Sequence, residues 1–189
     1  QNKLDEALIL CDEVNDRSIE HIIYNLKGSI YHKKNKPDLF KKNLLKAIEI
    51  KPDYFEAYRN LYLASLENKN YSDAIKYIKE LMILEQNKNP VSIYQLALAF
   101  ELSGSFVNAI KYYKISEELG FKEKKILFNN LGNVSLHNKN IKDAEHYFLK
   151  SLEIDDRNII VLDNIFNFYI KIRSYKKAEE INSKIEKID

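Results

Sequence analysis

The chain has 189 residues, of which 45% are hydrophobic and 31% are charged, and its formal net charge is +2. These values exclude a disordered chain, and the even balance of charges argues against the basic surface that binds nucleic acid. Only four glycines and three prolines occur. Few sharp turns and few broken helices are therefore expected, which favours an all-helical fold.

The single cysteine, Cys11, permits neither an internal disulfide nor a cysteine metal cluster. We expect it to be a buried packing residue. A chain of this kind fits a reducing compartment, so the cytoplasm is the favoured location. No apolar run approaches the roughly 18 residues of a membrane span, and no membrane insertion is expected.

Two series of residues recur along the chain with nearly the same period, 33 to 35 residues. The first series is Ala7, Phe40, Ala74, Ala109, Ala144 and Ala178, and the second is Leu26, Leu61, Leu96, Leu131 and Ile165. Most residues three before and four after the second series are apolar, which places one apolar stripe on a helix. A short polar break such as Asn68-Lys69-Asn70 then precedes a second amphipathic helix. In chain order we expect a lone helix near 3–15 and then five helix pairs.

These residues resemble the tetratricopeptide repeat family. Its aromatic, Leu-Gly, Ala and Phe pattern is matched by Phe128, Leu131-Gly132, Ala144 and Phe148. The resemblance implies an all-α, right-handed solenoid of about eleven helices with a concave, ligand-binding surface lined by first helices. The expected boundaries of this single array are a half-repeat at 1–19, followed by repeats at 20–54, 55–89, 90–124, 125–158 and 159–189.

The first full repeat and the two ends depart from the regular pattern. The loop before Phe40 is expected to be one residue longer than the others. Because the chain opens on a second helix, we expect the array to continue upstream. Asn182 stands where earlier second helices carry apolar residues such as Phe148, which predicts a solvent-facing cap near Asp189.

The sequence contains no recognisable catalytic, metal-binding or phosphate-binding motif. The four histidines (His21, His32, His137 and His146) lack metal-protease spacing, and we expect them to be solvent-exposed. No glycine-rich phosphate loop occurs and no acidic pair converges as acid and base. The sequence therefore predicts no catalytic residues, no metal site and no cofactor.

A carboxamide stands immediately before each member of the second series, at Asn25, Asn60, Gln95, Asn130 and Asn164, with Asn133 and Asn167 one turn further in the last two repeats. A carboxamide supplies a donor and an acceptor, as an extended backbone does. The row resembles the asparagine ladder of protein O-GlcNAc transferases, which implies that these side chains hold a polypeptide by its main chain.

We therefore expect a non-catalytic scaffold whose partner is a protein or peptide, with no nucleic-acid or membrane partner. Two alternatives stay open. The chain is a substrate-recruiting or regulatory domain of a larger enzyme such as a protein glycosyltransferase, or it is a scaffold that self-assembles into a homo-oligomer through the array ends.

Overall fold

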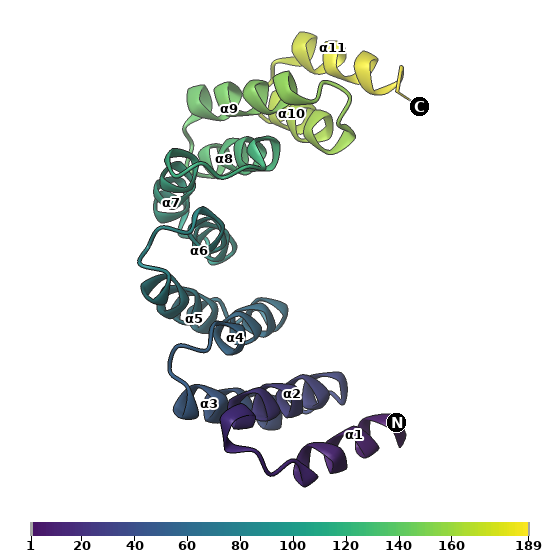
Figure 1. Ribbon diagram of the computed structural model, residues 1–189. Coiled ribbons are helices and arrows are strands. Elements are labelled where there is room, and N and C mark those ends of the chain that lie inside the picture. The colour runs from purple at the N-terminus through teal and green to yellow at the C-terminus, as the bar shows by residue number, and fades with distance from the viewer. Residues whose placement is uncertain (1, 189) are drawn as a thin grey trace. The chain divides into compact units, whose positions relative to one another are not determined.

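The computed structural model describes residues 2–188, and within them it contains eleven α-helices, one short 3-10 helix and no β-strand (Figure 1). The prediction of an all-α, helix-turn-helix fold is confirmed. The chain divides between Asn87 and Lys88 into two compact units. Each unit is described separately below.

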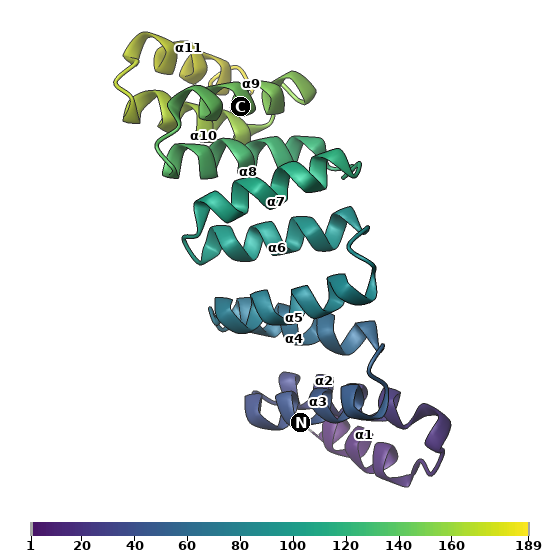
Figure 2. The ribbon, with the colours of Figure 1, turned by 90° about the vertical axis from the view of Figure 1, so that its left-hand side faces the viewer.

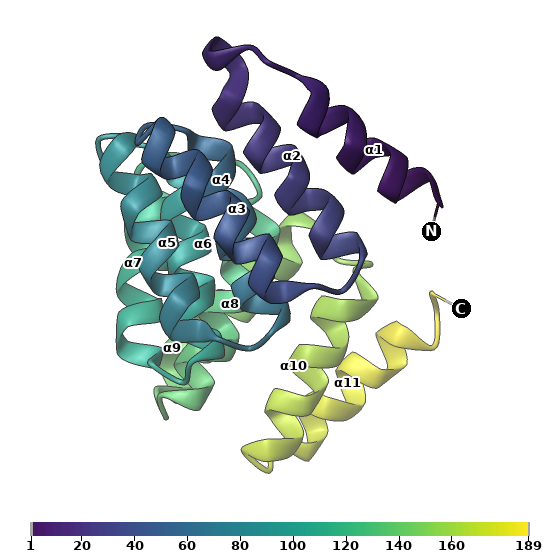
Figure 3. The same cartoon turned by 90° about the horizontal axis from the view of Figure 1, so that it is seen from below.

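The first unit holds five α-helices. They are α1 (Asn2–Glu13), α2 (Glu20–Lys33), α3 (Pro37–Ile50), α4 (Phe55–Glu67) and α5 (Tyr71–Leu84), with a 3-10 helix at Arg17–Ile19 before α2. Helices α2 and α3 form one hairpin and α4 and α5 form the next. Figure 3 shows α2 lying between α1 and α3. Two ion pairs hold α1 in that place: Lys27 of α2 binds Asp12, and Lys34, directly after α2, binds Asp5.

The second unit holds six helices in three hairpins. They are α6 (Pro90–Leu102) with α7 (Phe106–Glu118), α8 (Lys124–His137) with α9 (Ile141–Ile154), and α10 (Ile159–Lys171) with α11 (Tyr175–Ile185). Figure 2 shows the three hairpins stacked in chain order, with α9 and α10 overlapping in this view. Two adjoining apolar cores fill the stack, one around Tyr113 and Leu131 and one around Phe148 and Ile165.

Each hairpin turns through three residues, and the middle residue has a positive φ. These left-handed residues are Asn35, Lys69, Gly104, Lys139 and Arg173. The next backbone N–H closes the turn on a carbonyl of the first helix, as from Asn70 to Ser65 at 2.8 Å. Asn70 and Asn140 then cap the second helices by accepting from backbone N–H groups. Some of the abundant asparagines therefore have a local structural role.

The left-handed residues correct the expected register of the first full repeat. All five hairpin turns have the same length, so the predicted longer loop before Phe40 is wrong. No residue is inserted, because Phe40 lies five residues after the left-handed Asn35, as Ala74 lies five residues after Lys69. Counted back from the left-handed residue, Lys27 stands where Leu61 and Leu131 stand in their helices, and Leu26 moves one position aside. This shift explains why Leu26 is 47% exposed whereas Leu61 and Leu131 are buried.

The same register assigns the small residue of the first repeat to Gly28, at the position of Gly132 in α8. A Cβ built on Gly132 would lie 2.5 Å from Phe148 Cδ1, and one on Gly28 would lie 3.0 Å from Leu44 Cδ2. Both glycines therefore let the two helices of a hairpin approach closely.

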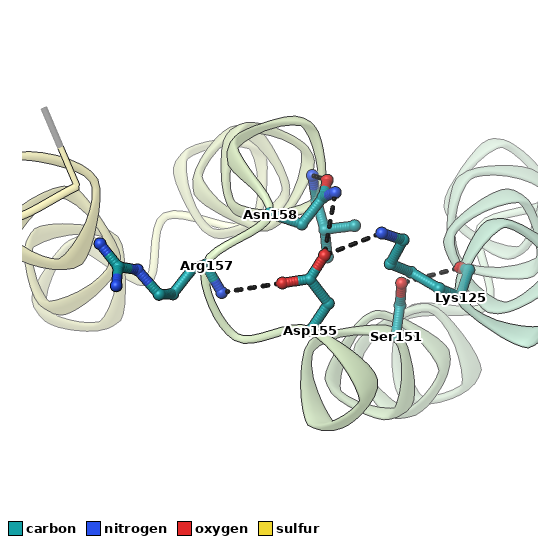
Figure 4. A network of polar contacts seen from close by, with 6 residues as sticks. Lys125, Ser151, Asp155, Arg157 and Asn158 are labelled. Carbon is teal, nitrogen blue, oxygen red and sulfur yellow. Dashed lines mark hydrogen bonds and ion pairs between the residues drawn. The ribbon is translucent and has the colours of Figure 1, made fainter.

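Polar side chains fix the link between α9 and α10 (Figure 4). The Asp155 carboxylate accepts from Lys125 Nζ at 2.8 Å and from Asn158 Nδ2 at 3.3 Å. On the preceding turn of α9, the buried Ser151 hydroxyl donates to the Lys125 carbonyl oxygen at 2.8 Å. Ser116 on α7 donates in the same way to the Pro90 carbonyl oxygen at 2.7 Å. These bonds pin the second helix of a hairpin to the start of its first helix.

The expectations for single residues have mixed outcomes. Cys11 is buried, as predicted. Three histidines are exposed, but His21 is buried and packs edge-on against the Tyr54 ring; the prediction for His21 is wrong because its ring fills the seam between α2 and the start of α4. Asn182 is half-buried and donates to Glu186 Oε1.

Candidate polypeptide-binding site

The carboxamide row occupies one position on four first helices. Asn60, Gln95, Asn130 and Asn164 each lie nine residues before the left-handed residue of their hairpin, and all four are half-buried. In α2 that position is held by Leu26 and not by Asn25. Asn25 therefore lies one residue before the row position and is not a member of the row.

Three asparagines of the row form hydrogen bonds to the first helix of the preceding hairpin in the same unit. In the first unit, Asn60 Nδ2 donates to Asn25 Oδ1 at 2.9 Å. In the second unit, Asn164 Nδ2 donates to Asn129 Oδ1 at 2.9 Å and Asn130 Nδ2 donates to the Tyr94 hydroxyl at 2.8 Å. The acceptor is always ten residues before the left-handed residue of the preceding hairpin.

Sequence reasoning missed this pairing, although a signal was present. Asn25 and Asn60 are 35 residues apart, as are Asn129 and Asn164, which matches the repeat period. The amide groups therefore have a structural use. The Oδ1 atoms of Asn60, Asn130 and Asn164 have no hydrogen-bond partner among the described residues, so each still offers an acceptor.

The remaining predicted site residues extend the row. Asn133 is half-buried and Asn167 is exposed. Each lies three residues after a row asparagine and so on the same face of its helix. Their part in binding, like that of the row, stays a prediction.

The structure adds apolar side chains to this face. Val91, Ile126 and Ile160 lie four residues before Gln95, Asn130 and Asn164, and they are 49%, 46% and 70% exposed. Because residues four apart share a helix face, each first helix of the second unit presents an exposed aliphatic side chain one turn before its carboxamide. We call Val91, Ile126 and Ile160 with Gln95, Asn130 and Asn164 the first-helix face of the second unit.

A polar cluster borders the first-helix face at α6, α7 and α8. The Tyr113 hydroxyl donates to Glu101 Oε2 at 2.5 Å, and Asn130 Nδ2 lies 3.3 Å from the Tyr113 oxygen. The Tyr94 ring stacks on Phe121 with 4.4 Å between centroids. Tyr113 is fully buried, whereas Glu101 and Tyr94 keep part of their surface exposed.

Burial determines the electrostatics of this cluster. Desolvation raises the pKa of Glu101, and the hydrogen bond from Tyr113 lowers it by less. Burial also raises the pKa of Tyr94 to about 12 and, with the nearby Glu101 carboxylate, strongly raises the pKa of Tyr113. Both phenols therefore stay protonated at neutral pH.

The corresponding face of the first unit has a different character. A hollow of about 210 Å³ adjoins Asn60 between α2, α3 and α4. Phe40 and Leu63 supply apolar walls, and His32 Nε2 lies 3.2 Å from Glu67 Oε2 at the rim. Leu63 is the one exposed aliphatic side chain in the lining of this hollow. The lining also includes the charged side chains of Lys33 and Glu67, whereas the first-helix face of the second unit has none.

In the part of the chain that the structure describes, no group of three or more His, Cys, Asp or Glu side chains is arranged to hold a metal ion. Among the described residues, no helix combines the length and apolarity needed to cross a bilayer.

Comparison with known proteins agrees with this architecture. The sequence pattern of the tetratricopeptide repeat matches residues 22–54 and 127–158, one segment in each unit. The chain thus carries tetratricopeptide repeats, and within each unit the described helices form hairpins that pack as the repeats of such solenoids do. No curated protein sequence matches the chain significantly.

Solved structures of tetratricopeptide proteins are similar over most of the chain. PilF of Pseudomonas aeruginosa has a TM-score of 0.68 and 21% identity, over 92% of this chain and 78% of PilF. MamA has a TM-score of 0.77 and 18% identity, over 88% of this chain and 90% of MamA. YrrB, described as a TPR protein with an unusual peptide-binding site, has a TM-score of 0.71 and 18% identity, over 91% and 90%. At these identities the likeness shows the fold.

Proposed function

We propose that this protein is a non-catalytic scaffold that binds an extended polypeptide on the first-helix face of the second unit. The observation that carries the proposal is the pairing of exposed Ile126 and Ile160 with the open acceptors of Asn130 and Asn164. Tetratricopeptide repeat proteins generally act as protein-interaction scaffolds, and the peptide-binding description of YrrB supports the same class of ligand.

The face suits an extended chain in both chemistry and spacing. Carboxamide oxygens accept from backbone N–H groups, and the aliphatic side chains cover apolar residues of the ligand. Packed helices lie about 8–10 Å apart, and an extended chain advances about 3.3 Å per residue. About three ligand residues therefore span the distance from one first helix to the next.

The magnitudes predict modest affinity. Two hydrogen bonds, to Asn130 and Asn164, contribute roughly 0.5–1.5 kcal/mol each, and covering three half-exposed aliphatic side chains contributes about 1 kcal/mol each. Ordering the ligand costs about 2–5 kcal/mol. The aliphatic residues are thus needed, because the hydrogen bonds alone do little more than offset the ordering cost.

The test uses unstructured peptides of about 15 residues, selected from a display library on the 189-residue protein. Their affinities are then measured for Ile126→Glu/Ile160→Glu and for the matched control Val107→Glu/Leu149→Glu, which alters exposed residues of the second helices α7 and α9. We expect at least a tenfold loss in the first variant only. Equal affinity for both variants would remove the first-helix face from the proposal.

The two alternatives predict other outcomes. A substrate-recruiting domain of a larger enzyme, as in the protein O-GlcNAc transferases, predicts that the selected peptides resemble segments that the enzyme modifies. A self-assembling scaffold predicts a mass that rises with concentration in light scattering. A constant monomer mass together with peptide binding favours the scaffold that binds a separate partner.

A further inference from the structure

Glu101 places an acidic side chain at a repeat position where the other hairpins have none. It lies three residues before the left-handed residue Gly104. Leu66, Leu136 and Ile170 occupy the same position in α4, α8 and α10, and His32 occupies it in α2. A largely buried carboxylate is costly unless it is paired with a cation or fully hydrogen-bonded.

The partners of Glu101 inside the protein are incomplete. Its Oε2 accepts from the Tyr113 hydroxyl, but among the described residues no basic side chain forms an ion pair with Glu101 and no donor reaches Oε1. Glu145 on α9, by contrast, has the Lys177 ammonium 2.6 Å from its Oε1. Glu101 lacks this compensation.

Hydrogen-bond directions show what the surrounding cluster has left to offer. Asn130 Nδ2 donates to both phenol oxygens, and Tyr113 donates its proton to Glu101. Glu101 Oε1 and Asn130 Oδ1 therefore remain as acceptors, and the Tyr94 oxygen keeps a lone pair. The Tyr94 ring, stacked on Phe121 and tilted against Tyr113 at 5.3 Å, supplies an aromatic wall. A negative charge with several acceptors beside aromatic faces matches a cation that carries several N–H donors.

We infer that Glu101, together with Asn130 and Tyr94, holds a lysine or arginine side chain of the polypeptide that binds the first-helix face. This inference rests on the proposed function, since the basic side chain is delivered by that ligand. The Glu101 side chain keeps part of its surface exposed, so the cation approaches Oε1 from the solvent side while the Tyr113 hydroxyl donates to Oε2.

The probe for this site is a small one, so that it does not depend on knowing the natural ligand. N-acetyl-arginine methylamide is titrated into the isotope-labelled protein, and N-acetyl-citrulline methylamide, which has the same shape without the charge, is the control. Chemical shifts of the Asn130 side-chain amide and the Tyr94 ring report on the site. The variant Glu101→Gln removes the charge but keeps an oxygen that accepts from Tyr113, so the fold is retained.

We expect saturable shifts at Asn130 and Tyr94 with the arginine compound, at least about tenfold weaker binding by the citrulline compound, and loss of the effect in Glu101→Gln. Absence of shifts at these two residues, or equal binding by both compounds or by both proteins, would overturn the inference. The display peptides distinguish a failure of the proposed function from a failure of the cation site. If they still depend on Ile126 and Ile160 while the arginine compound does not bind, only the cation site is refuted.

Discussion

Replacing Gly132 by alanine tests the close approach of α8 and α9. In a helix interior, alanine is favoured over glycine by about 1 kcal/mol. The new Cβ, however, would lie 2.5–2.8 Å from three ring atoms of Phe148, whereas carbon atoms in contact are about 3.5–4.0 Å apart. Phe148 is 1% exposed, so the ring has little room, and such overpacking costs about 1–3 kcal/mol. The net change is a destabilisation of about 0–2 kcal/mol.

Gly28→Ala is the matched control for this prediction. There the Cβ would lie 3.0–3.1 Å from atoms of the Leu44 side chain, and small movements of that side chain relieve the contact. The higher helix propensity of alanine therefore offsets or exceeds the cost of the contact. Urea titrations followed by circular dichroism should place Gly132→Ala about 1–2 kcal/mol below Gly28→Ala in unfolding free energy. If Gly132→Ala is as stable as Gly28→Ala or more so, the reasoning from the Phe148 contact is refuted.

Three further predictions concern hydrogen bonds and charge. In a double-mutant cycle of Asn60→Ala with Asn25→Ala, urea unfolding should show a coupling of about 0.5–1.5 kcal/mol, and additive effects would contradict the bond between them. Ser151→Ala should lose about 1 kcal/mol in the same assay because the buried Lys125 carbonyl oxygen loses its donor, and an unchanged midpoint would argue against that bond. Burial raises the pKa of Glu101, so the stability that its protonated carboxyl contributes is fully present below the unfolded-state pKa and is lost as the pH rises through the raised value. In thermal melts, the melting temperature of Glu101→Gln should therefore rise relative to that of the wild type between pH 4 and pH 7. A difference in melting temperature that does not change with pH would contradict this.

The repeat and its helices were predictable because they depend on local spacing. Alanine, leucine and aromatic residues at a period near 35 determine which helix faces are buried, and stacked hairpins are the arrangement that covers those faces. Leu61 and Leu131 are buried as that pattern requires. The sequence pattern failed at α2, where Lys27, and not Leu26, occupies the position of Leu61 and Leu131. Because Lys27 is charged, a series chosen by residue type selects its apolar neighbour Leu26 instead.

The candidate site was predictable in outline only. The sequence places carboxamides at Asn130 and Asn164, but their orientation depends on neighbours from the preceding hairpin. The acceptors Tyr94 and Asn129 are 36 and 35 residues earlier, and no rule of local spacing selects them. The exposure of Ile126 and Ile160 was also hidden, because an aliphatic residue on an amphipathic helix is ordinarily assigned to the core.

Site-specific crosslinking tests the central claim most directly. A photoreactive residue is placed at Asn133, on the first-helix face, or at exposed Lys142 on α9, and each protein is irradiated with the same display-selected peptide. Binding on the first-helix face predicts that the peptide is captured from position 133 and not from position 142. Capture from position 142 alone would contradict the proposal and assign binding to the second helices.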